Sequence, residues 1–195
     1  MFGAIGYLYY KSKDEVSLVE VEKLDSPSNQ IDEDDLYIIE STCPVGTTEN
    51  MMNLIYLKRP ELHGNIYIAY CPERVIPGNI LKELIYNDRV VGGINELSSL
   101  KCKKFYESFC KGNVYMTDSS TAELVKLSEN SYRDLNIAFA NELSIICNEY
   151  KIKVDELIKL ANKHPRVNIH NPSCGVGGHC IAVDPWFIAS QLPDQ

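Results

Sequence analysis

The chain has 195 residues, of which 45% are hydrophobic and 24% charged, which is the composition of an ordinary globular protein with one core, or one domain plus a helical appendage. Its formal net charge of -8, without any cluster of Lys or Arg, argues against DNA or RNA as a partner. No apolar run approaches the roughly 20 residues of a membrane span, the start lacks signal-peptide features, and seven scattered cysteines favour reduced thiols in a cytoplasm.

Residues 1–30 predict no clear element, and after them strand and helix patterns alternate. Runs rich in β-branched and aromatic residues predict buried strands, and the runs between them predict helices, the first capped by Thr residues. The strands are expected at 35–42, 65–73, 88–94 and 113–117, and the helices at 44–59, 78–85 and 95–110. The expected core positions of the first and third helices are Met51, Leu54, Ile55 and Leu57, and Leu97, Leu100, Phe105 and Phe109.

Strands separated by helix-length segments form βαβ units, which predict an α/β fold with a mostly parallel sheet. Such a sheet binds ligands beyond the carboxyl ends of its strands. The segments "STCPVGT" and "CPERVIPG" follow the first and second predicted strands, so Thr42 and Glu73 are candidate site residues. The alternative is that both segments are turns that only end the strands.

The pattern of alternating strand-like and helix-like segments ends at Ser119. From there to residue 150 the chain contains no Gly or Pro, and a capping box from Ser120 to Glu123 predicts one long helix. A shorter helix, "KVDELIKLANK", is ended by Pro165. A domain boundary is therefore expected near residue 118, which gives domains 1–117 and 118–195.

The long helix carries a polar stripe of Lys126, Asn130 and Arg133 at spacings that place the three side chains on one face. Such a stripe suits a hydroxylated or phosphorylated ligand, although a solvated face is the usual role of helical Lys and Arg. The rest of the helix is apolar nearly all round, so it is expected to be buried, with its stripe facing a cleft or another subunit.

The segment "NPSCGVGGHCIAVDP" at residues 171–185 concentrates Cys, His and Gly. A zinc site would use His170, Cys174, His179 and Cys180, but their spacing matches no standard knuckle, so a metal is not expected. Gly175, Gly177 and Gly178 allow a tight turn that approaches a ligand closely or presents N–H groups to an anion. This turn is not the G-x-G-x-x-G nucleotide fingerprint, because no strand precedes it.

A third interpretation of the segment is a reactive thiolate at Cys180. If "HCIAVDPWFIA" is helical, Cys180 lies in the first turn, where the positive end of the helix dipole favours a thiolate. Asp184 then follows one turn later on the same face.

Taken together, these motifs resemble the UDP-glucose/GDP-mannose dehydrogenase family, and within it the UDP-N-acetyl-D-mannosamine 6-dehydrogenase branch. The matching stretches run in family order from Asp35 to the end: "ESTCPVGTTE", "CPERVIPG", "NDRVVGGI", "TAELVKLSENSYRDLNIAFANELSIIC", "LANKHPRVNI" and "GVGGHCIAVDPWFI". The resemblance implies the second half of a Rossmann-like parallel sheet, followed by an all-α central dimerisation domain with one long helix. It also implies NAD as cofactor, a UDP-sugar as substrate and a homodimer formed through that helix.

The implied reaction is a four-electron oxidation of the sugar C6 alcohol to the uronic acid, through a thioester on Cys180. Lys126 matches the family's catalytic lysine, and Asn130 matches the amide beside it. Asp184 matches the aspartate that closes the cysteine motif. Thr42 and Glu73 match the residues that position the nicotinamide or a water. Contact with the nucleotide sugar is implied for Lys126, Asn130, Arg74, Val75, Arg133, His164, Arg166 and Gly177, with the His164/Arg166 pair reaching across the dimer.

Two departures from the family pattern leave alternatives open. The chain lacks the family's opening glycine fingerprint and its third, UDP-gripping domain, so a chain truncated at both ends, with weak NAD binding and little turnover, is expected. The alternatives are a non-catalytic fragment that serves only as a dimerisation and sugar-pocket module, and a UDP-glucose-type enzyme. Val183 and His179 in the cysteine motif favour the N-acetylmannosamine branch.

Overall fold

A computed structural model describes residues 6–11, 15–20, 31–75, 78–176 and 181–190. The chain divides into two compact units, Met1–Lys126 and Leu127–Gln195. Within the described ranges, no helix combines the length and apolar character that a membrane crossing requires.

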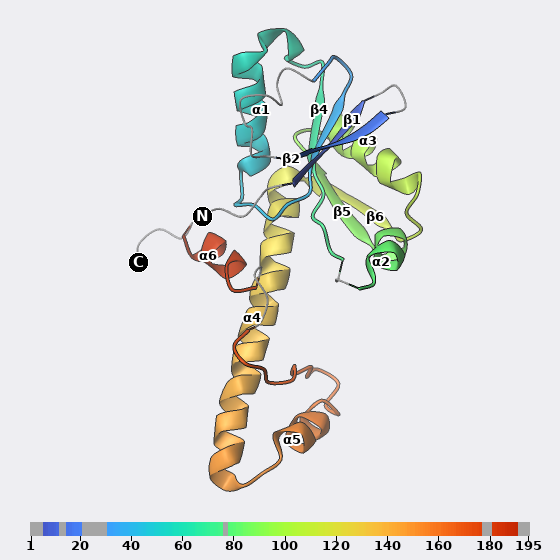
Figure 1. Ribbon diagram of the computed structural model, residues 1–195. Coiled ribbons are helices and arrows are strands. Elements are labelled where there is room, and N and C mark those ends of the chain that lie inside the picture. Colours follow the sequence, from blue (N-terminus) through green and yellow to red (C-terminus); the bar gives the residue numbers. More distant parts are fainter. Residues whose placement is uncertain (1–5, 12–14, 21–30, 76–77, 177–180, 191–195) are drawn as a thin grey trace. The chain divides into compact units, whose positions relative to one another are not determined.

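The first unit is built on a six-stranded sheet in the order β2-β1-β3-β4-β5-β6 (Figure 1). The pairs β3–β4 and β5–β6 are parallel, as predicted, whereas β4–β5, β1–β2 and β1–β3 are antiparallel. The α/β fold is therefore confirmed. The strands are β1 Gly6–Lys11, β2 Glu15–Glu20, β3 Leu36–Ile39, β4 Tyr67–Tyr70, β5 Arg89–Gly93 and β6 Val114–Asp118.

Two features of the sheet differ from the predictions. The segments "GYLYYK" and "EVSLVE", for which no element was predicted, form the β1–β2 hairpin; their aromatic and β-branched residues favour extended backbone. The prediction of a parallel sheet is wrong for β5 against β4, because the short helix α2 (Ile80–Tyr86) does not carry the chain back across the sheet. An antiparallel neighbour requires no such crossover.

Two apolar layers cover the two faces of the sheet. Alternate residues of β3 point to opposite sides, so Tyr37 and Ile39 pack with Ile55 of α1 (Thr47–Lys58), whereas Ile38 packs with Tyr106 of α3 (Glu96–Glu107). Figure 1 shows α1 and α3 on opposite sides of the strands.

The predicted core face of α3 is wrong by about one residue. Leu97, Leu100 and Phe109 are exposed, and the buried face instead carries Ser98, Ser99, Cys102 and Tyr106. The two serine hydroxyls accept hydrogen bonds from strand backbone, Ser98 from Ile68 N at 3.3 Å and Ser99 from Gly93 N at 2.8 Å. Small polar side chains thus let α3 approach the sheet more closely than leucines would. In α1, likewise, Ile55 is buried, but Leu54 and Leu57 are exposed.

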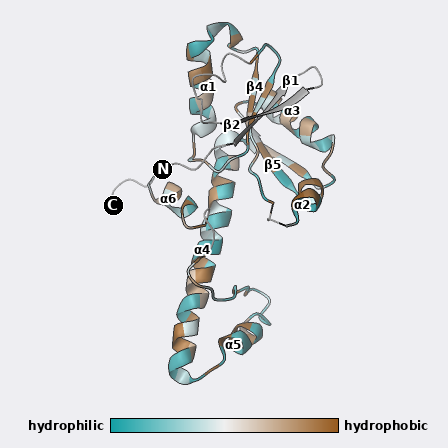
Figure 2. Cartoon of the chain, viewed as in Figure 1, coloured by the Kyte–Doolittle hydropathy of each residue, from teal (hydrophilic) through white to brown (hydrophobic). Residues whose placement is uncertain are grey.

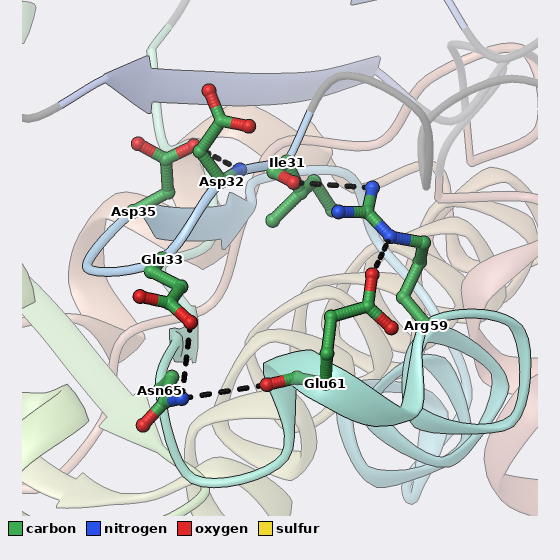
Figure 3. Close-up of polar contacts among 7 residues, drawn as sticks. All are labelled: Ile31, Asp32, Glu33, Asp35, Arg59, Glu61 and Asn65. Carbon is green, nitrogen blue, oxygen red and sulfur yellow. Dashed lines mark hydrogen bonds and ion pairs between the residues drawn. The ribbon is translucent and has the colours of Figure 1, made fainter.

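Polar contacts fix the chain just before β3 (Figure 3). Asp35 accepts a hydrogen bond from Asp32 N at 2.8 Å, and Asn65 Nδ2 donates to Glu33 at 3.4 Å. Arg59 binds both Glu61 and the carbonyl oxygen of Ile31. This cluster, together with the short 3-10 helix η3 (Pro60–Leu62), sets where β3 and β4 begin.

Helix α4 (Ser119–Tyr150) confirms the predicted long helix, and α5 (Val154–Ala161) follows it. The prediction that α4 is buried is wrong for this single chain, since Leu135 is 69% and Phe139 52% exposed. Ala122, Leu127, Ala140 and Cys147 are buried, whereas further apolar side chains of the helix are exposed; Figure 2 colours apolar residues brown along it. The exposed ones are Leu124, Leu135, Phe139, Ile145 and Ile146.

The thiolate interpretation assumed a helix over residues 179–189, and the described part of that segment is helical only from Asp184. α6 spans Asp184–Ala189, and Ile181–Val183 form a turn before it. Pro185, in the first turn of α6, favours a helix start at this point because its ring fixes φ and it lacks an N–H group. Asp184 is therefore at the beginning of the helix rather than one turn inside it.

Candidate functional site

Thr42 and Glu73 follow β3 and β4, which are parallel neighbours with Ile39 opposite Tyr70. The pairing continues past the strand ends, because Glu73 N donates to Glu40 O at 3.0 Å. Both side chains are half-buried. The loops that the sequence singled out therefore lie side by side at one edge of the sheet, where α/β folds bind ligands.

The loop after β4 is ordered by the Glu73 carboxylate. One of its oxygens accepts the N–H groups of Arg74 at 2.7 Å and Val75 at 3.0 Å. Lys126 Nζ, from the second turn of α4, donates to Glu73 O at 2.8 Å. The structure thus brings Lys126 to the backbone of Glu73, and the Arg74 guanidinium to Asp88 O at 3.4 Å.

The loop after β3 is held by Glu123, which the sequence analysis had placed in a capping box of the long helix. Its carboxylate accepts Gly46 N at 2.6 Å, Thr48 N at 2.8 Å and the Thr48 hydroxyl at 2.6 Å. The predicted Thr cap of α1 is wrong, since Gly46 is the N-cap and makes no side-chain cap bond. Gly46 has φ of 91°, a left-handed conformation that glycine adopts at little cost.

The predicted capping box of α4, from Ser120 to Glu123, is wrong as well, because the Glu123 carboxylate binds the start of α1 instead. Asp118, not Ser120, caps the helix, accepting Thr121 N at 2.8 Å and the Thr121 hydroxyl at 2.6 Å. These bonds lower the pKa of the exposed Asp118 carboxyl. The Glu123 side chain does not take part in this cap and instead binds the amino end of α1. Local spacing in the sequence could not reveal this contact.

Cys43, next to Thr42 in the chain, is fully buried and its thiol faces Glu123 at 4.0 Å. Burial, followed by the negative charge of Glu123, raises the pKa of Cys43 to about 12. A neutral thiol is a poor nucleophile, so Cys43 is structural despite its position at the sheet edge.

Glu40, the last residue before the loop that holds Thr42, was not recognised from the sequence. Tyr106 OH donates to it at 2.5 Å, and Arg89 stacks on the Tyr106 ring with its guanidinium carbon 4.6 Å from the centroid. Burial raises the pKa of Glu40; the Tyr106 bond and Arg89 oppose the shift, and Glu73 adds to it.

Glu40→Gln is expected to stabilise the protein increasingly as the pH rises. A carboxyl whose folded pKa lies above its ordinary value of 4.5 favours folding while protonated, and that contribution is lost as the pH rises through the folded pKa. The glutamine does not titrate and still accepts the Tyr106 bond. Urea unfolding from pH 4 to 8 should show the smallest difference at low pH, and a difference independent of pH would contradict the assignment.

The second unit contains a separate polar pair. Asn130 of α4 donates to Asp184 at the start of α6 at 2.5 Å, and the two residues are 5% and 4% exposed. An amide donating to a carboxylate in a buried setting is one of the stronger kinds of hydrogen bond. Two residues that the sequence proposed separately are therefore brought together.

Asp184→Ala is expected to cost about 2 kcal/mol of unfolding free energy, because it leaves the buried Asn130 amide without its acceptor. Urea unfolding followed by circular dichroism measures this cost, with Glu142→Ala, an exposed position on the helix that carries Asn130, as control. In a double-mutant cycle, Asn130→Ala should add little to Asp184→Ala. Fully additive effects would mean that the pair does not act as a unit.

His164 and Arg166 are exposed on the loop after α5. Asparagines hold the backbone of this loop: Asn162 pairs with both backbone groups of Ile169, at 2.9 and 2.8 Å, and Asn136 binds Asn168 O at 3.0 Å and His170 N at 2.8 Å. Arg133 is exposed on α4. Cys180 and Gly177 lie outside the described residues, and Cys174 is exposed.

A cavity of about 330 Å³ lies elsewhere in the first unit, at the carboxyl ends of β5 and β6. Three of its polar side chains have partners: Asn95 caps α3, Asp118 caps α4, and Ser99 bridges Gly93 N and Thr117 O. These three side chains thus hold the starts of two helices and the ends of two strands. The lining residues are Gly93, Ile94, Asn95, Glu96, Ser99, Met116, Thr117 and Asp118.

Comparison with known proteins gives a consistent assignment. The NAD binding domain of the UDP-glucose/GDP-mannose dehydrogenase family matches residues 11–110, and the central domain of that family matches residues 120–195. A UDP-N-acetyl-D-mannosamine dehydrogenase of Methanococcus vannielii is 56% identical over 83% of the chain and 36% of its own length. One from Escherichia coli K12 is 55% identical over 82% of the chain and 40% of its length.

A solved structure agrees with this assignment. A UDP-D-ManNAc dehydrogenase from Pyrococcus horikoshii superimposes with a TM-score of 0.80 at 46% identity, over 86% of this chain and 40% of that one. The chain thus spans about two fifths of the length of these relatives.

Proposed function

Because this chain belongs to the UDP-glucose/GDP-mannose dehydrogenase family, we propose that it takes part in the NAD-dependent oxidation of the C6 alcohol of UDP-N-acetyl-D-mannosamine to the carboxylate. Relatives named for this sugar, at 55% and 56% identity, support the choice of substrate. The observation that carries the proposal is the sheet edge at which Lys126 binds the loop after β4, beside the loop that carries Thr42. Residues 1–117 then form part of the NAD-binding domain, and residues 118–195 form the central domain.

The proposed chemistry removes two hydrides from one carbon in succession. Loss of the first converts the alcohol to an aldehyde, and the Cys180 thiolate adds to that carbonyl to give a thiohemiacetal. Loss of the second gives a thioester, which water cleaves to the carboxylate and the free thiol. NAD, when bound, supplies the hydride acceptor for both oxidations.

The roles of the remaining residues follow from their chemistry and their match to the family motifs. The Lys126 ammonium is proposed to stabilise negative charge on the substrate oxygen and to relay its proton. Asn130 and Asp184 are proposed to orient the reacting groups as a pair. Thr42 and Glu73 are proposed to position the nicotinamide or the attacking water.

The sheet edge fits one end of NAD. Half-buried polar side chains at the ends of adjacent parallel strands suit the nicotinamide. The amino end of α1, by contrast, already binds the Glu123 carboxylate through Gly46 and Thr48. The phosphates of the cofactor must therefore be held by other groups.

Nucleotide-sugar contacts are proposed for the exposed or half-buried residues that match the branch-specific motifs. The exposed apolar residues of α4 support a homodimer formed through that helix, with His164 and Arg166 reaching the partner's sugar site. The buried cysteines are free thiols, in keeping with a cytoplasmic location. The full set of sugar contacts is Arg74, Val75, Lys126, Asn130, Arg133, His164, Arg166 and Gly177.

The test is NADH formation by this chain with NAD and UDP-N-acetyl-D-mannosamine, at high protein concentration. Two NADH are expected for each uronic acid formed, with UDP-glucose a much poorer substrate. If no NADH forms while the sugar still binds by calorimetry, the chain is the non-catalytic sugar-pocket module. Equal turnover of UDP-glucose would instead favour the UDP-glucose-type alternative.

A further inference from the structure

We infer that Glu123 is a positioning residue. Its carboxylate joins the loop that carries Thr42 to the helical turn that precedes Lys126, and it thereby keeps the Thr42 and Lys126 side chains at a fixed separation. This inference rests on the proposed function, because it assigns a role to Glu123 in the same oxidation. Every residue involved belongs to the first compact unit.

The Glu123 carboxylate is deeply buried and bound only by neutral donors among the described contacts. Its side chain is 0% exposed, and it accepts Gly46 N, Thr48 N and the Thr48 hydroxyl at 2.6 to 2.8 Å. Two of these donors are N–H groups at the amino end of α1, where a negative charge is favoured by the helix dipole. The charge is thus held by a geometry that only a correctly placed loop provides.

Glu123 and Lys126 are three residues apart, so one lies about a turn above the other on α4. Glu123 fixes the loop after β3, and Lys126 fixes the loop after β4 through Glu73 O at 2.8 Å. The same turns of α4 therefore hold both strand ends. A shift of the Glu123 side chain moves Thr42 relative to Lys126, which is the separation that oriented catalysis requires.

Packing of the first turn of α4 does not itself depend on the carboxylate. Ala122 is 0% exposed and belongs to the apolar layer that contains Ile39 and Tyr70. A Cβ added to Gly92 would meet the Ala122 Cβ at 2.7 Å, so the helix already lies directly on β5. Apolar contact seats the helix, and Glu123 sets the position of the loop.

Glu123→Gln is the central test, because glutamine keeps the size of the side chain but presents an NH2 group to one of the donors. Amide hydrogen exchange at Gly46 or Thr48 is expected to accelerate about tenfold, as expected for the loss of one hydrogen bond. Acylation of Lys126, read by mass spectrometry against the exposed Lys159, is expected to increase at least twofold. A purely local role at α1 would change the first readout and leave Lys126 unaffected.

The steady-state kinetics of the same variant, Glu123→Gln, provide the second measurement. kcat is expected to fall about tenfold while KM for the UDP-sugar changes less than twofold, because orientation rather than binding is lost. Glu142→Gln, an exposed glutamate on the same helix, is the matched control and should leave every readout unchanged. If Glu123→Gln does not fold, Thr48→Val removes one hydroxyl donor and should shift the exchange and acylation readouts in the same direction.

The two proposals fail separately. If the wild-type chain forms no NADH, the proposed function is wrong for this chain, and hydrogen exchange and Lys126 acylation still decide the positioning inference. If NADH forms and Glu123→Gln matches the wild type in Lys126 acylation and kcat, the positioning inference is overturned and the function stands.

Discussion

Replacing Cys180 by serine is expected to lower formation of the uronic acid by a thousandfold or more, on the order of what removal of a catalytic nucleophile costs. A serine hydroxyl ionises far less readily than a thiol and forms an ester rather than a thioester. The aldehyde therefore has no efficient covalent route to the second oxidation. At most one NADH per sugar should appear, and intact-mass spectrometry should find no sugar adduct on the chain.

The matched control for Cys180 is Cys174→Ser, six positions earlier and exposed. It should retain wild-type NADH formation and the adduct. Loss of activity in Cys174→Ser with activity retained in Cys180→Ser would transfer the nucleophile to Cys174. Equal, small effects of both changes would remove the covalent mechanism altogether.

Lys126→Met is expected to lower kcat by about a hundredfold to a thousandfold, the usual effect of losing a positioned charge or proton-transfer group. Methionine retains most of the apolar length of the side chain but lacks the ammonium that donates to Glu73 O at 2.8 Å. Single-turnover NADH formation measures the effect on the first hydride transfer.

Lys159→Met on α5 is the control for Lys126, since this lysine is exposed. Recovery of activity as the pH rises, in Lys126→Met but not in the wild type, would support loss of charge stabilisation over loss of packing. A Lys126→Met variant with wild-type kcat would exclude the lysine from the chemistry.

Much of the fold followed from local patterns, and the errors have physical causes. The strands around Ile38 and Ile68 were predicted correctly, because β-branched residues suit buried extended backbone. The α3 face was missed because hydrophobic periodicity gives no weight to Ser98 and Ser99, whose hydroxyls bind the sheet backbone. The antiparallel β5 was missed because sequence spacing does not show whether a short helix crosses the sheet.

The candidate site was predictable where it depends on position along the chain, and not where it depends on long-range contacts. Thr42 and Glu73 could be found from the ends of their strands. The role of Glu123 could not, since its partners lie 75 and 77 residues away and a capping box gave a sufficient local explanation. Asn130 and Asp184, 54 residues apart, became a pair only in the structure.

The asparagines that hold the loop after α5 have a consequence for how the protein can diverge. Asn136 and Asn162 bind backbone groups of this loop, and Asn141 accepts Ser173 N further along it, so most of its path is held by side chains outside its exposed positions. His164 is an exception, because its Nδ1 accepts Arg166 N at 3.3 Å, whereas the exposed Arg166 side chain can be exchanged without changing these contacts. A library randomised at Arg166, with His164 and the asparagines kept constant, is a direct route to altered ligand preference.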